Sequence, residues 1–353
     1  MNQDILLGLS YNDVLLIPQY SDIESRLDVD LSTQITPHVK LKIPLISTNM
    51  STVTNVAMAI ELGKLGGFGV IPRFMPAEEE ANMVSEVKKK NGFVGAAIGE
   101  REDPIERSEM VIKAGADILF LDVAHGFMEK TLRTTKLLRQ HFGDKIDIVS
   151  GNVATEEATA ALFESGADSV KVGIGPGTTC ITRVETGCGV PQITAVLEAS
   201  KAARKYKKTL ICDGGMENSG DVVKGLAAGA SAIMSGNLFA GAKESAGKII
   251  KKNGKFYKEY NGSTSLVEKL RQLKKMGGKL PSNYAKQVEG VETLVPYEGP
   301  LSQVVEKLTA NIRSGFSYLG AREISVLWKN AHFVRISPMG FHENGAHNVI
   351  LAS

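Results

Sequence analysis

The chain has 353 residues, of which 43% are hydrophobic and 23% are charged, and its formal net charge at pH 7 is +2. This composition supplies enough apolar side chains for a large core and argues against intrinsic disorder. The basic residues are scattered, so the sequence lacks the concentrated positive charge that binds nucleic acid, and we expect no nucleic-acid partner.

The N-terminal segment, residues 1–42, is mostly polar. Its first residues, MNQDILLGLSYNDVLL, do not place an apolar stretch after a basic one, so they do not resemble a signal peptide. No apolar run approaches the roughly 20 residues of a membrane span. Three cysteines, Cys180, Cys188 and Cys212, are too few for a disulfide framework, and no CxxC pair suggests zinc. We expect a reduced, cytoplasmic protein with no membrane partner.

From residue 43 onward, short apolar runs alternate with longer amphipathic stretches. The runs are typical of strands buried on both faces of a parallel sheet: 43–47, 67–71, 93–99, 117–123, 147–153, 169–174, 209–215 and 231–236. The stretches that predict helices are 51–64, 77–90, 103–114, 127–141, 155–165, 191–205 and 218–228. Eight such units without a large interruption predict an α/β fold of the (β/α)8 TIM-barrel type, with a doubly wound sheet as the alternative. Residues 1–42 would then be an N-terminal extension that covers the bottom of the barrel.

Polar or glycine-rich clusters follow most of the predicted strands. They are Thr48 to Met50, Asp122 with His125, Gly151-Asn152, the loop GIGPGTTC at 173–180, Asp213-Gly214-Gly215, and Gly236-Asn237. The carboxyl ends of the strands are where barrel active sites are built. One glycine there usually marks a plain turn, but three glycine-rich ends on strands six to eight predict a phosphorylated ligand held by backbone N–H groups.

Residues 248–300 leave the barrel before its last helix. They are rich in Lys, Gly, Asn and Ser, and a long excursion of this kind in a compact domain is usually functional or disordered. We expect an active-site flap inserted after the eighth strand, with the Lys-rich runs 251–258 and 269–279 as its solvated faces. Helix-forming residues resume at 301–313 and 321–331. The whole chain, 1–353, is thus expected to be one catalytic barrel domain.

The loop GIGPGTTCITR, residues 173–183, contains the main candidate for chemistry. Three glycines and a proline between positions 173 and 177 impose an irregular backbone with exposed amides and carbonyls. Cys180 in this loop is a candidate nucleophile, although a free cysteine often serves only as a small hydrophobic residue. Thr182 could relay a proton. We expect Cys212 to be buried in a strand and Cys188 to serve packing.

Several segments of the chain resemble the IMP dehydrogenase/GMP reductase family. They are GNVAT (151–155), KVGIGPGTTCITR (171–183), GVPQITAV (189–196), CDGG (212–215) and MSGNLFAG (234–241). The likeness extends from YNDVLLIPQYSDIESR (11–26) to FVRIS (333–337) and the tail beyond, and the cysteine loop is highly specific. The resemblance implies a (β/α)8 barrel that usually forms a homotetramer and acts on a purine nucleoside monophosphate with NADPH or NAD.

The same resemblance implies roles for individual residues. Cys180 would attack purine C2, while Thr182 and Glu289 would handle protons. The nucleotide would contact Thr48 and Met50 through its base, Asp213 through its ribose, and the rest of the site through its phosphate: Thr178, Gly214, Gly215, Gly236, Asn237 and Tyr260. The nicotinamide cofactor would lie near Asp122, Ala124, Asn152, Lys171 and Gly173. Carbonyls of Gly175, Gly177 and Cys180 could bind a potassium ion.

Two activities share this covalent chemistry, and the sequence favours GMP reductase over IMP dehydrogenase. The dehydrogenases activate water with an Arg-Tyr pair on the flap, whereas the comparable stretch here is Pro281-Ser-Asn283-Tyr284, and asparagine is not a general base. YNGSTS (260–265) and Asn49-Met50 also resemble the reductases, and VKKKNGF (87–93) runs into the third strand without the regulatory domains that many dehydrogenases insert.

Other segments resemble the dehydrogenases, namely GVPQITAV and the FVRIS…GFHENGAHNV tail (333–349). Three positions depart from the family pattern: Ser51 replaces an aspartate, Pro72 precedes Arg73 where histidine is common, and Asn237 replaces serine or glycine. IMP dehydrogenase is therefore the alternative activity. A flavin-dependent barrel oxidase and a non-catalytic nucleotide-binding relative are alternatives of other classes.

Overall fold

Eight parallel strands close into a barrel in the order β10-β11-β4-β5-β6-β7-β8-β9, so the TIM-barrel prediction is confirmed. The computed structural model describes residues 5–90, 92–100, 103–277, 280–281, 283–346 and 349. The barrel strands are β4 (Leu45–Ser47), β5 (Phe68–Ile71), β6 (Val94–Ile98), β7 (Ile118–Asp122), β8 (Asp147–Val153), β9 (Ser169–Val172), β10 (Thr209–Asp213) and β11 (Ala232–Ser235). Each falls within a predicted apolar run, since both faces of a barrel strand are buried.

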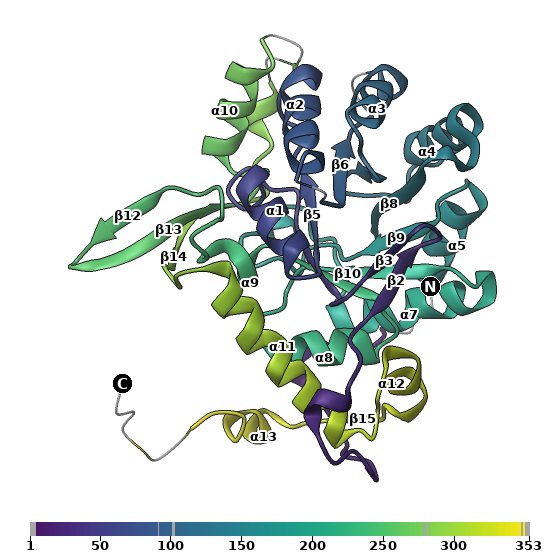
Figure 1. Cartoon of the computed structure of the whole chain (residues 1–353), viewed down its shortest axis with the longest axis vertical. Coiled ribbons are helices and arrows are strands. Elements are labelled where there is room, and N and C mark those ends of the chain that lie inside the picture. Colours follow the sequence, from purple (N-terminus) through teal and green to yellow (C-terminus); the bar gives the residue numbers. More distant parts are fainter. Residues whose placement is uncertain are drawn as a thin grey trace.

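Helices surround the barrel (Figure 1). They are α1 (Val56–Lys64), α2 (Ala77–Lys88), α3 (Pro104–Lys113), α4 (Glu129–Phe142), α5 (Glu156–Glu164), α7 (Gln192–Tyr206) and α8 (Ser219–Ala227). The helix that completes this ring, α11 (Leu301–Tyr318), packs between α8 and α1. Helix α1 begins later than predicted because the Asn55 side chain caps it by accepting a hydrogen bond from the Met58 N–H. Residues 51–54 are thereby left to the loop after β4.

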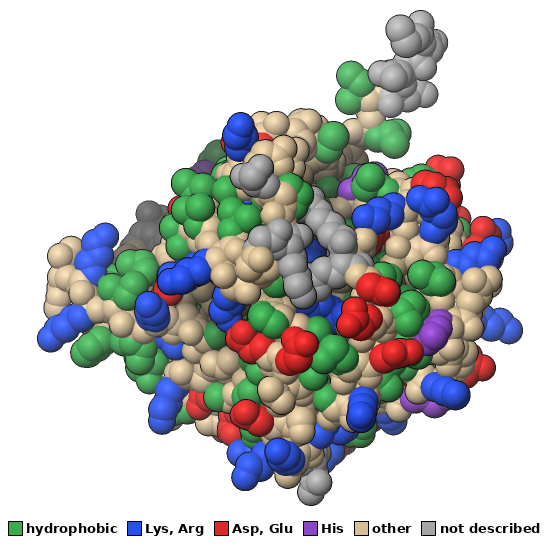
Figure 2. All heavy atoms as spheres, turned by 90° about the horizontal axis from the view of Figure 1, so that it is seen from above, with side chains coloured by type: hydrophobic (Ala, Val, Ile, Leu, Met, Phe, Trp, Pro, Cys, Tyr) green, Lys and Arg blue, Asp and Glu red, His purple; other side chains and the backbone are tan. Residues whose placement is uncertain are grey.

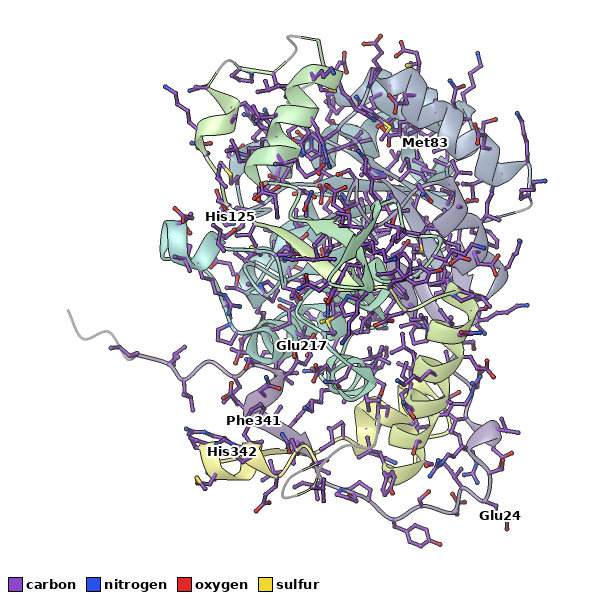
Figure 3. The ribbon with its side chains drawn as sticks, turned by 90° about the vertical axis from the view of Figure 1, so that its left-hand side faces the viewer. Glu24, Met83, His125, Glu217, Phe341 and His342 are labelled. Atoms are coloured by element: carbon purple, nitrogen blue, oxygen red, sulfur yellow. The ribbon has the colours of Figure 1, made fainter. Side chains whose placement is uncertain are left out.

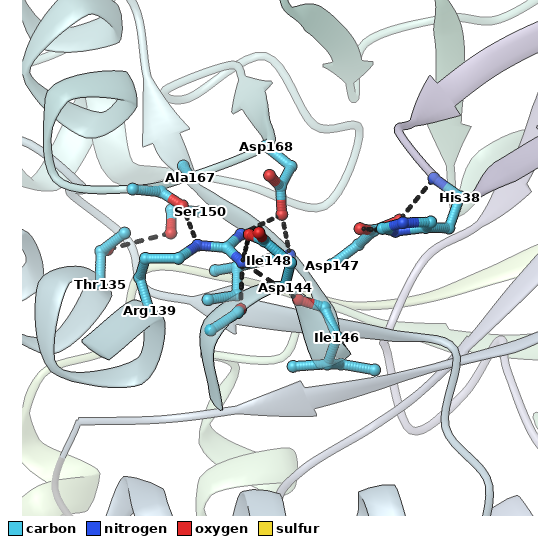
Figure 4. A network of polar contacts seen from close by, with 12 residues as sticks. His38, Thr135, Arg139, Asp144, Ile146, Asp147, Ile148, Ser150, Ala167 and Asp168 are labelled. Atoms are coloured by element: carbon cyan, nitrogen blue, oxygen red, sulfur yellow. Dashed lines mark hydrogen bonds and ion pairs between the residues drawn. The ribbon is translucent and has the colours of Figure 1, made fainter. Parts of the chain in front are cut away.

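The N-terminal extension covers the bottom of the barrel, as predicted, through the hairpin of β2 (Thr33–Thr36) and β3 (Val39–Leu41). The hairpin bonds to the first residues of three barrel strands. The Thr33 hydroxyl donates to the Ser231 carbonyl (2.7 Å), and the Ile35 carbonyl accepts from the Thr209 hydroxyl (2.6 Å). Asp147 accepts from both the N–H and the ring of His38. Figure 4 shows this last contact beside the ion pair of Arg139 and Asp168.

Residues after β11 form an ordered substructure rather than a structureless loop. The short helix α9 (Asn237–Ala240) leads to an antiparallel sheet of β12 (Ile249–Lys252), β13 (Lys255–Asn261) and β14 (Glu292–Pro296), interrupted by α10 (Leu266–Lys275) and the 3₁₀ turn η4 (Tyr284–Lys286). Residues 278–279 and 282, which belong to the predicted flap, lie outside the described residues. The β12–β13 hairpin projects from the barrel (Figure 1).

The expectation of solvated lysines in this segment is wrong at two positions. Lys258 and Lys269 are buried, and their ammonium groups donate to backbone carbonyls, including those of Ser245 (2.8 Å) and Tyr284 (3.2 Å). The lysines at 251, 252 and 255, on the projecting hairpin, are exposed as expected. On the face drawn in Figure 2, Lys and Arg side chains are mixed with Asp and Glu.

Segments near the two ends of the described chain pair with each other. Strand β1 (Val14–Leu16) pairs antiparallel with β15 (Phe333–Arg335), which follows helix α12 (Ile324–Asn330). Helix α13 (Pro338–His342), which carries the labelled Phe341 and His342 in Figure 3, contacts the 3₁₀ turn η1 (Tyr11–Asp13). None of the helices in the described part of the chain combines the length and apolar character needed to cross a membrane.

Candidate active site

A cavity of about 430 Å³ opens at the carboxyl ends of the barrel strands and extends under the flap. A smaller cavity adjoins it and shares part of its lining. The predicted residues that line the larger cavity are Thr48, Met50, Asp122, Ala124, Asn152, Lys171, Gly173, Gly175, Gly177, Cys180, Thr182, Asp213, Gly214 and Glu289. Gly236 and Tyr260 line the smaller one. The fold therefore brings these predicted residues from distant segments together on one face of the barrel.

Three predicted ligand contacts lie outside both linings: Thr178, Gly215 and Asn237. Thr178 is exposed, whereas the next residue, Thr179, is buried and lines the smaller cavity. Residue types alone do not indicate which of the two threonines lines the cavity, because an irregular loop has no periodicity to show which side chain points inward. Thr178 therefore stays a prediction as a phosphate contact. The Asn237 amide donates to the Met216 carbonyl (3.4 Å).

The three predicted catalytic side chains form a continuous hydrogen-bonded chain. The Cys180 thiol donates to the Thr182 hydroxyl (3.2 Å), which donates to the Glu289 carboxylate (2.8 Å). Cys180 is partly buried and faces the cavity, and Thr182 is the first residue of the short helix α6 (Thr182–Thr186). This arrangement places a nucleophile beside a hydroxyl and a carboxylate that can accept and return a proton.

The backbone of the flap holds Glu289 in place against the cysteine loop. Gly290 forms an antiparallel bridge with Cys180, and the Ile181 N–H donates to the Glu289 carbonyl (2.9 Å). One residue after Gly290, the Val291 N–H donates to the Thr179 carbonyl (3.0 Å). Glu289 itself precedes β14 rather than lying in it.

A buried lysine joins two carboxylates at the floor of the cavity. The Lys171 ammonium group is 2.9 Å from Asp122 and 3.4 Å from Asp213. Burial alone would lower the pKa of Lys171, but the two carboxylates outweigh it and raise this pKa above its ordinary value. Burial would likewise raise the pKa of Asp122, and the positive charges of Lys171 and Arg73 overcome it and lower that pKa. Both groups are thus held in their charged forms.

Asn152 fixes the orientation of Asp213 within this cluster. Its amide nitrogen donates to the Asp213 carboxylate and to the Gly173 carbonyl, both at 2.9 Å. Gly173 has a positive φ, and a Cβ there would lie 2.2 Å from the Asp213 carbonyl, so only glycine fits between strands β9 and β10. One oxygen of Asp213 therefore bonds to Asn152, and the carboxylate lines both cavities.

Tyr260 closes the smaller cavity from the flap side. Burial raises the pKa of its hydroxyl well above the ordinary value, so the phenol stays protonated. A Cβ on Gly236 would lie 2.7 Å from the Tyr260 hydroxyl, which explains the glycine at the end of the eighth strand. This corner presents hydroxyl groups and glycine backbone, a combination suited to an oxyanion.

Several cavity residues were not predicted as contacts. Arg73, Phe74, Glu100 and Arg107 line the side of the cavity near β5 and β6, and the flap adds Lys269, Leu280, Tyr284 and Gln287. Arg73 and Glu100 each lie two residues beyond the end of a barrel strand, so their positions could have indicated them.

One histidine and two cysteines that the sequence analysis named lie outside the cavity lining. His125, labelled in Figure 3, is exposed and does not line the cavity. Cys188 is exposed, so the expectation that it serves packing is wrong. Cys212 is buried as expected, and burial raises the pKa of its thiol to about 11. Cys180 is the cysteine that lines the cavity.

Among the described residues, no three His, Cys, Asp or Glu side chains gather as a metal site. The backbone carbonyls of the cysteine loop remain as oxygen ligands for a hard cation. The Gly177 carbonyl already accepts a hydrogen bond from the Cys180 N–H (3.0 Å), which leaves it one further lone pair.

Comparisons with known proteins agree on one family. Residues 8–347 match the family model described as IMP dehydrogenase / GMP reductase domain. The chain is 39% identical to inosine-5'-monophosphate dehydrogenase of Cryptosporidium parvum, over 97% of this chain and 95% of that protein. It is 32% identical to the enzyme of the same name from Nitrosopumilus maritimus, over 98% and 99% of the two chains.

A solved structure is similar as well. It is a crystal structure of a cysteine-to-alanine variant of Trypanosoma brucei GMP reductase in complex with guanosine 5'-monophosphate. It superposes with a TM-score of 0.92 at 28% identity and covers 98% of this chain and 99% of that one.

Proposed function

The chain belongs to the IMP dehydrogenase/GMP reductase family, and on that premise we propose that it reduces GMP to IMP and ammonia with NADPH. As a member of this family it is an NAD(P)-dependent purine nucleotide oxidoreductase. The observation that carries the proposal is the hydrogen-bonded chain Cys180–Thr182–Glu289, which can deliver a proton to a leaving amine without an arginine at position 283.

The proposed reaction has two steps at purine C2. The Cys180 thiolate adds to C2, and the amine at C2 leaves as ammonia after Thr182 and Glu289 supply its proton. The resulting thioimidate accepts a hydride from the reduced nicotinamide at C2, the C–S bond then breaks, and the thiolate is restored with release of IMP. The relay needs a carboxyl group that gains and loses a proton, and Glu289 supplies it.

The proposed nucleotide position follows from the two cavities. The purine lies against Cys180 and Met50, and the ribose hydroxyls bond to Asp213. The phosphate enters the corner formed by Gly236 and Tyr260, where Thr179 also lines the smaller cavity. Thr178, Gly215 and Asn237 remain proposed phosphate contacts. The cofactor fits the larger cavity beside Asp122, Ala124, Asn152, Lys171 and Gly173. Potassium at the carbonyls of Gly175, Gly177 and Cys180, a homotetramer and a cytoplasmic location are proposed on the family resemblance alone.

We also propose a single catalytic domain without inserted regulatory domains, with a flap at about 248–300. The alignment with the Nitrosopumilus protein is 473 positions long, which exceeds the length of this chain, so that relative carries additional residues. In this chain α2 ends at Lys88 and β6 begins at Val94, which leaves no room for a domain between them.

IMP dehydrogenase is the second candidate. The curated relatives reported above carry that name, whereas the solved structure is a GMP reductase. Against the dehydrogenase, position 283 in the flap is asparagine, and the Tyr284 hydroxyl donates to the Gln272 side chain (2.6 Å). The neighbouring tyrosine is thus already engaged within the flap.

One experiment separates the two candidates. Purified protein is mixed with GMP and NADPH, and separately with IMP and NAD, and followed at the absorbance band of the reduced cofactor. We expect NADPH to be consumed with GMP and ammonia to be released in equal amount. XMP formed from IMP, with no ammonia from GMP, would establish the dehydrogenase instead.

A further inference from the structure

A buried carboxylate joins the flap to the loop after the first barrel strand. Glu268, in the first turn of α10, has only 2% of its side chain exposed. One oxygen accepts a hydrogen bond from the Ser51 hydroxyl (2.5 Å), and the other accepts from Asn261 (3.0 Å) and Arg271 (2.5 Å). The Glu268 carboxylate is therefore bonded to three side chains, those of Ser51, Asn261 and Arg271.

Helix capping does not account for this position of Glu268. The sequence Ser265-x-x-Glu268 matches a capping box, in which the glutamate would bond back to the N–H of the capping serine. Here the Ser265 hydroxyl accepts from the Glu268 N–H (3.4 Å), but the Ser265 N–H donates to the Gly262 carbonyl instead. The carboxylate bonds to Arg271 on its own helix and reaches across to Ser51 and Asn261.

Both main partners of Glu268 adjoin residues that line the site. Ser51 follows Met50 and Asn261 follows Tyr260, and these two neighbours line the same smaller cavity. A second hydrogen bond joins the same two segments: the Asn261 N–H donates to the buried Thr52 hydroxyl (3.1 Å). The flap and the first loop are therefore connected immediately behind the proposed nucleotide site.

The flap segment held by Glu268 also contacts the catalytic glutamate. The Glu289 N–H donates to the Thr264 carbonyl (3.2 Å), and Thr264 lies between Asn261 and the start of α10. A shift of this segment away from the first loop would therefore move both Tyr260 and Glu289.

We propose that Glu268 is a positioning residue, which holds the flap against the first loop and so places Tyr260 and Glu289 relative to Met50 and Cys180. The proposal rests on the proposed function only for the choice of substrates in the activity assay. It also gives a physical reason for the serine at position 51. A hydroxyl donates to the Glu268 carboxylate, whereas an aspartate there would place two like charges in contact.

The test is a pair of substitutions with a rescue. Ser51 is exposed, so Ser51→Asp fits without filling the core, and it should loosen the flap by charge repulsion. Adding Glu268→Gln should restore the contact, because the glutamine amide donates to Asp while its oxygen still accepts from Asn261 and Arg271. Glu79→Gln is the matched control, since the ion pair of Lys275 with Glu79 also joins α10 to the barrel but is half-exposed on both sides, and this change leaves every tryptic site of the flap in place.

Two measurements are made on each variant. The first is the rate of tryptic cleavage within residues 266–287, with and without GMP. The second is kcat and KM for GMP with NADPH, and for IMP with NAD. Ser51→Asp should increase flap cleavage about tenfold and decrease kcat/KM about tenfold, as expected for loss of one hydrogen bond to a charged group. The double variant should return to within about threefold of the unmodified protein, and Glu79→Gln should match the unmodified protein.

Two results would overturn the proposal. One is a Ser51→Asp protein with unchanged cleavage and unchanged kinetics. The other is a double variant as impaired as Ser51→Asp alone, because then the damage does not pass through Glu268. The cleavage assay needs no turnover, so a protein inactive on GMP would refute the proposed function while leaving this test intact.

Discussion

Thr182 donates a hydrogen bond of 2.8 Å to Glu289, although 107 positions separate the two residues in the chain. Thr182 begins a short helix after the sixth barrel strand, and Glu289 lies in the flap. The flap is therefore part of the proton relay and not only a cover for the site.

Cys180→Ala should abolish turnover while GMP and IMP still bind within about tenfold of the unmodified affinity. The thiolate makes the covalent bond, whereas Asp213 and the phosphate corner supply contacts elsewhere. Activity and nucleotide affinity should be measured on the same preparation. Normal turnover by the alanine protein would contradict the mechanism.

Glu289→Gln should decrease the rate of ammonia release by about 10²–10⁴-fold, because an amide of the same shape cannot shuttle a proton. Thr182→Val should have an effect in the same direction, since it interrupts the hydrogen-bonded chain. Glu292→Gln is the control: it removes a carboxylate from the same flap, and its oxygen can still accept from the Val267 N–H. Equal rates for the 289 and 292 variants would argue against the relay.

Asp213→Ala should weaken nucleotide binding roughly ten- to a hundredfold. The lost interaction is a charge-assisted hydrogen bond to a ribose hydroxyl, worth about 1.5–3 kcal/mol. Titration calorimetry with GMP measures it. Glu217→Ala changes the charge of the same loop at an exposed position, labelled in Figure 3, and should leave affinity unchanged. An unaltered affinity for Asp213→Ala would mean that the ribose lies elsewhere.

Asn283→Arg should leave GMP reduction within about twofold, because ammonia departure uses Thr182 and Glu289 rather than a base that activates water. The unmodified protein should also reduce GMP faster than it oxidises IMP. Both rates are read from cofactor absorbance. A large gain of GMP reduction on introducing the arginine would show that the relay is incomplete without it.

The contact between His38 and Asp147 should make stability depend on pH. The hydrogen bond to Asp147 raises the pKa of His38 above its ordinary value, so the charged histidine stabilises the folded protein. This stabilisation is fully present below the unfolded pKa of about 6.5 and is lost as pH rises through the higher folded value. The Tm difference between the unmodified protein and His38→Ala should therefore be larger at about pH 5.5 than at about pH 9. Parallel Tm curves for the two proteins across this range would contradict the assignment.

The barrel could be predicted from the sequence because each strand is buried on both faces and its apolar run is continuous. The flap sheet could not be predicted in the same way. Its first strand, Ile249–Lys252, is exposed along its whole length, and burial of Lys258 depends on carbonyls of a distant loop. Neither property leaves a pattern in the local sequence.

The residues of the candidate site also differ in how well the local sequence predicts them. Cys180 and Thr182 are close together in one distinctive loop, so the sequence indicates them directly. Glu289 follows from family resemblance alone, because nothing near it in the chain marks it as catalytic. Which of Thr178 and Thr179 lines the smaller cavity depends on the backbone of an irregular loop, which residue types do not determine.

The pairing of β1 with β15 has a consequence for biosynthesis. Val14 lies opposite Arg335, so this ladder cannot form until nearly the whole chain has left the ribosome. The eight barrel strands, by contrast, are complete by Ser235. The nascent barrel can therefore assemble while its N-terminal strand still lacks a partner and exposes an unpaired edge, the kind of surface that promotes aggregation. Pairing with β15 removes that edge only once residues 333–335 have been synthesised.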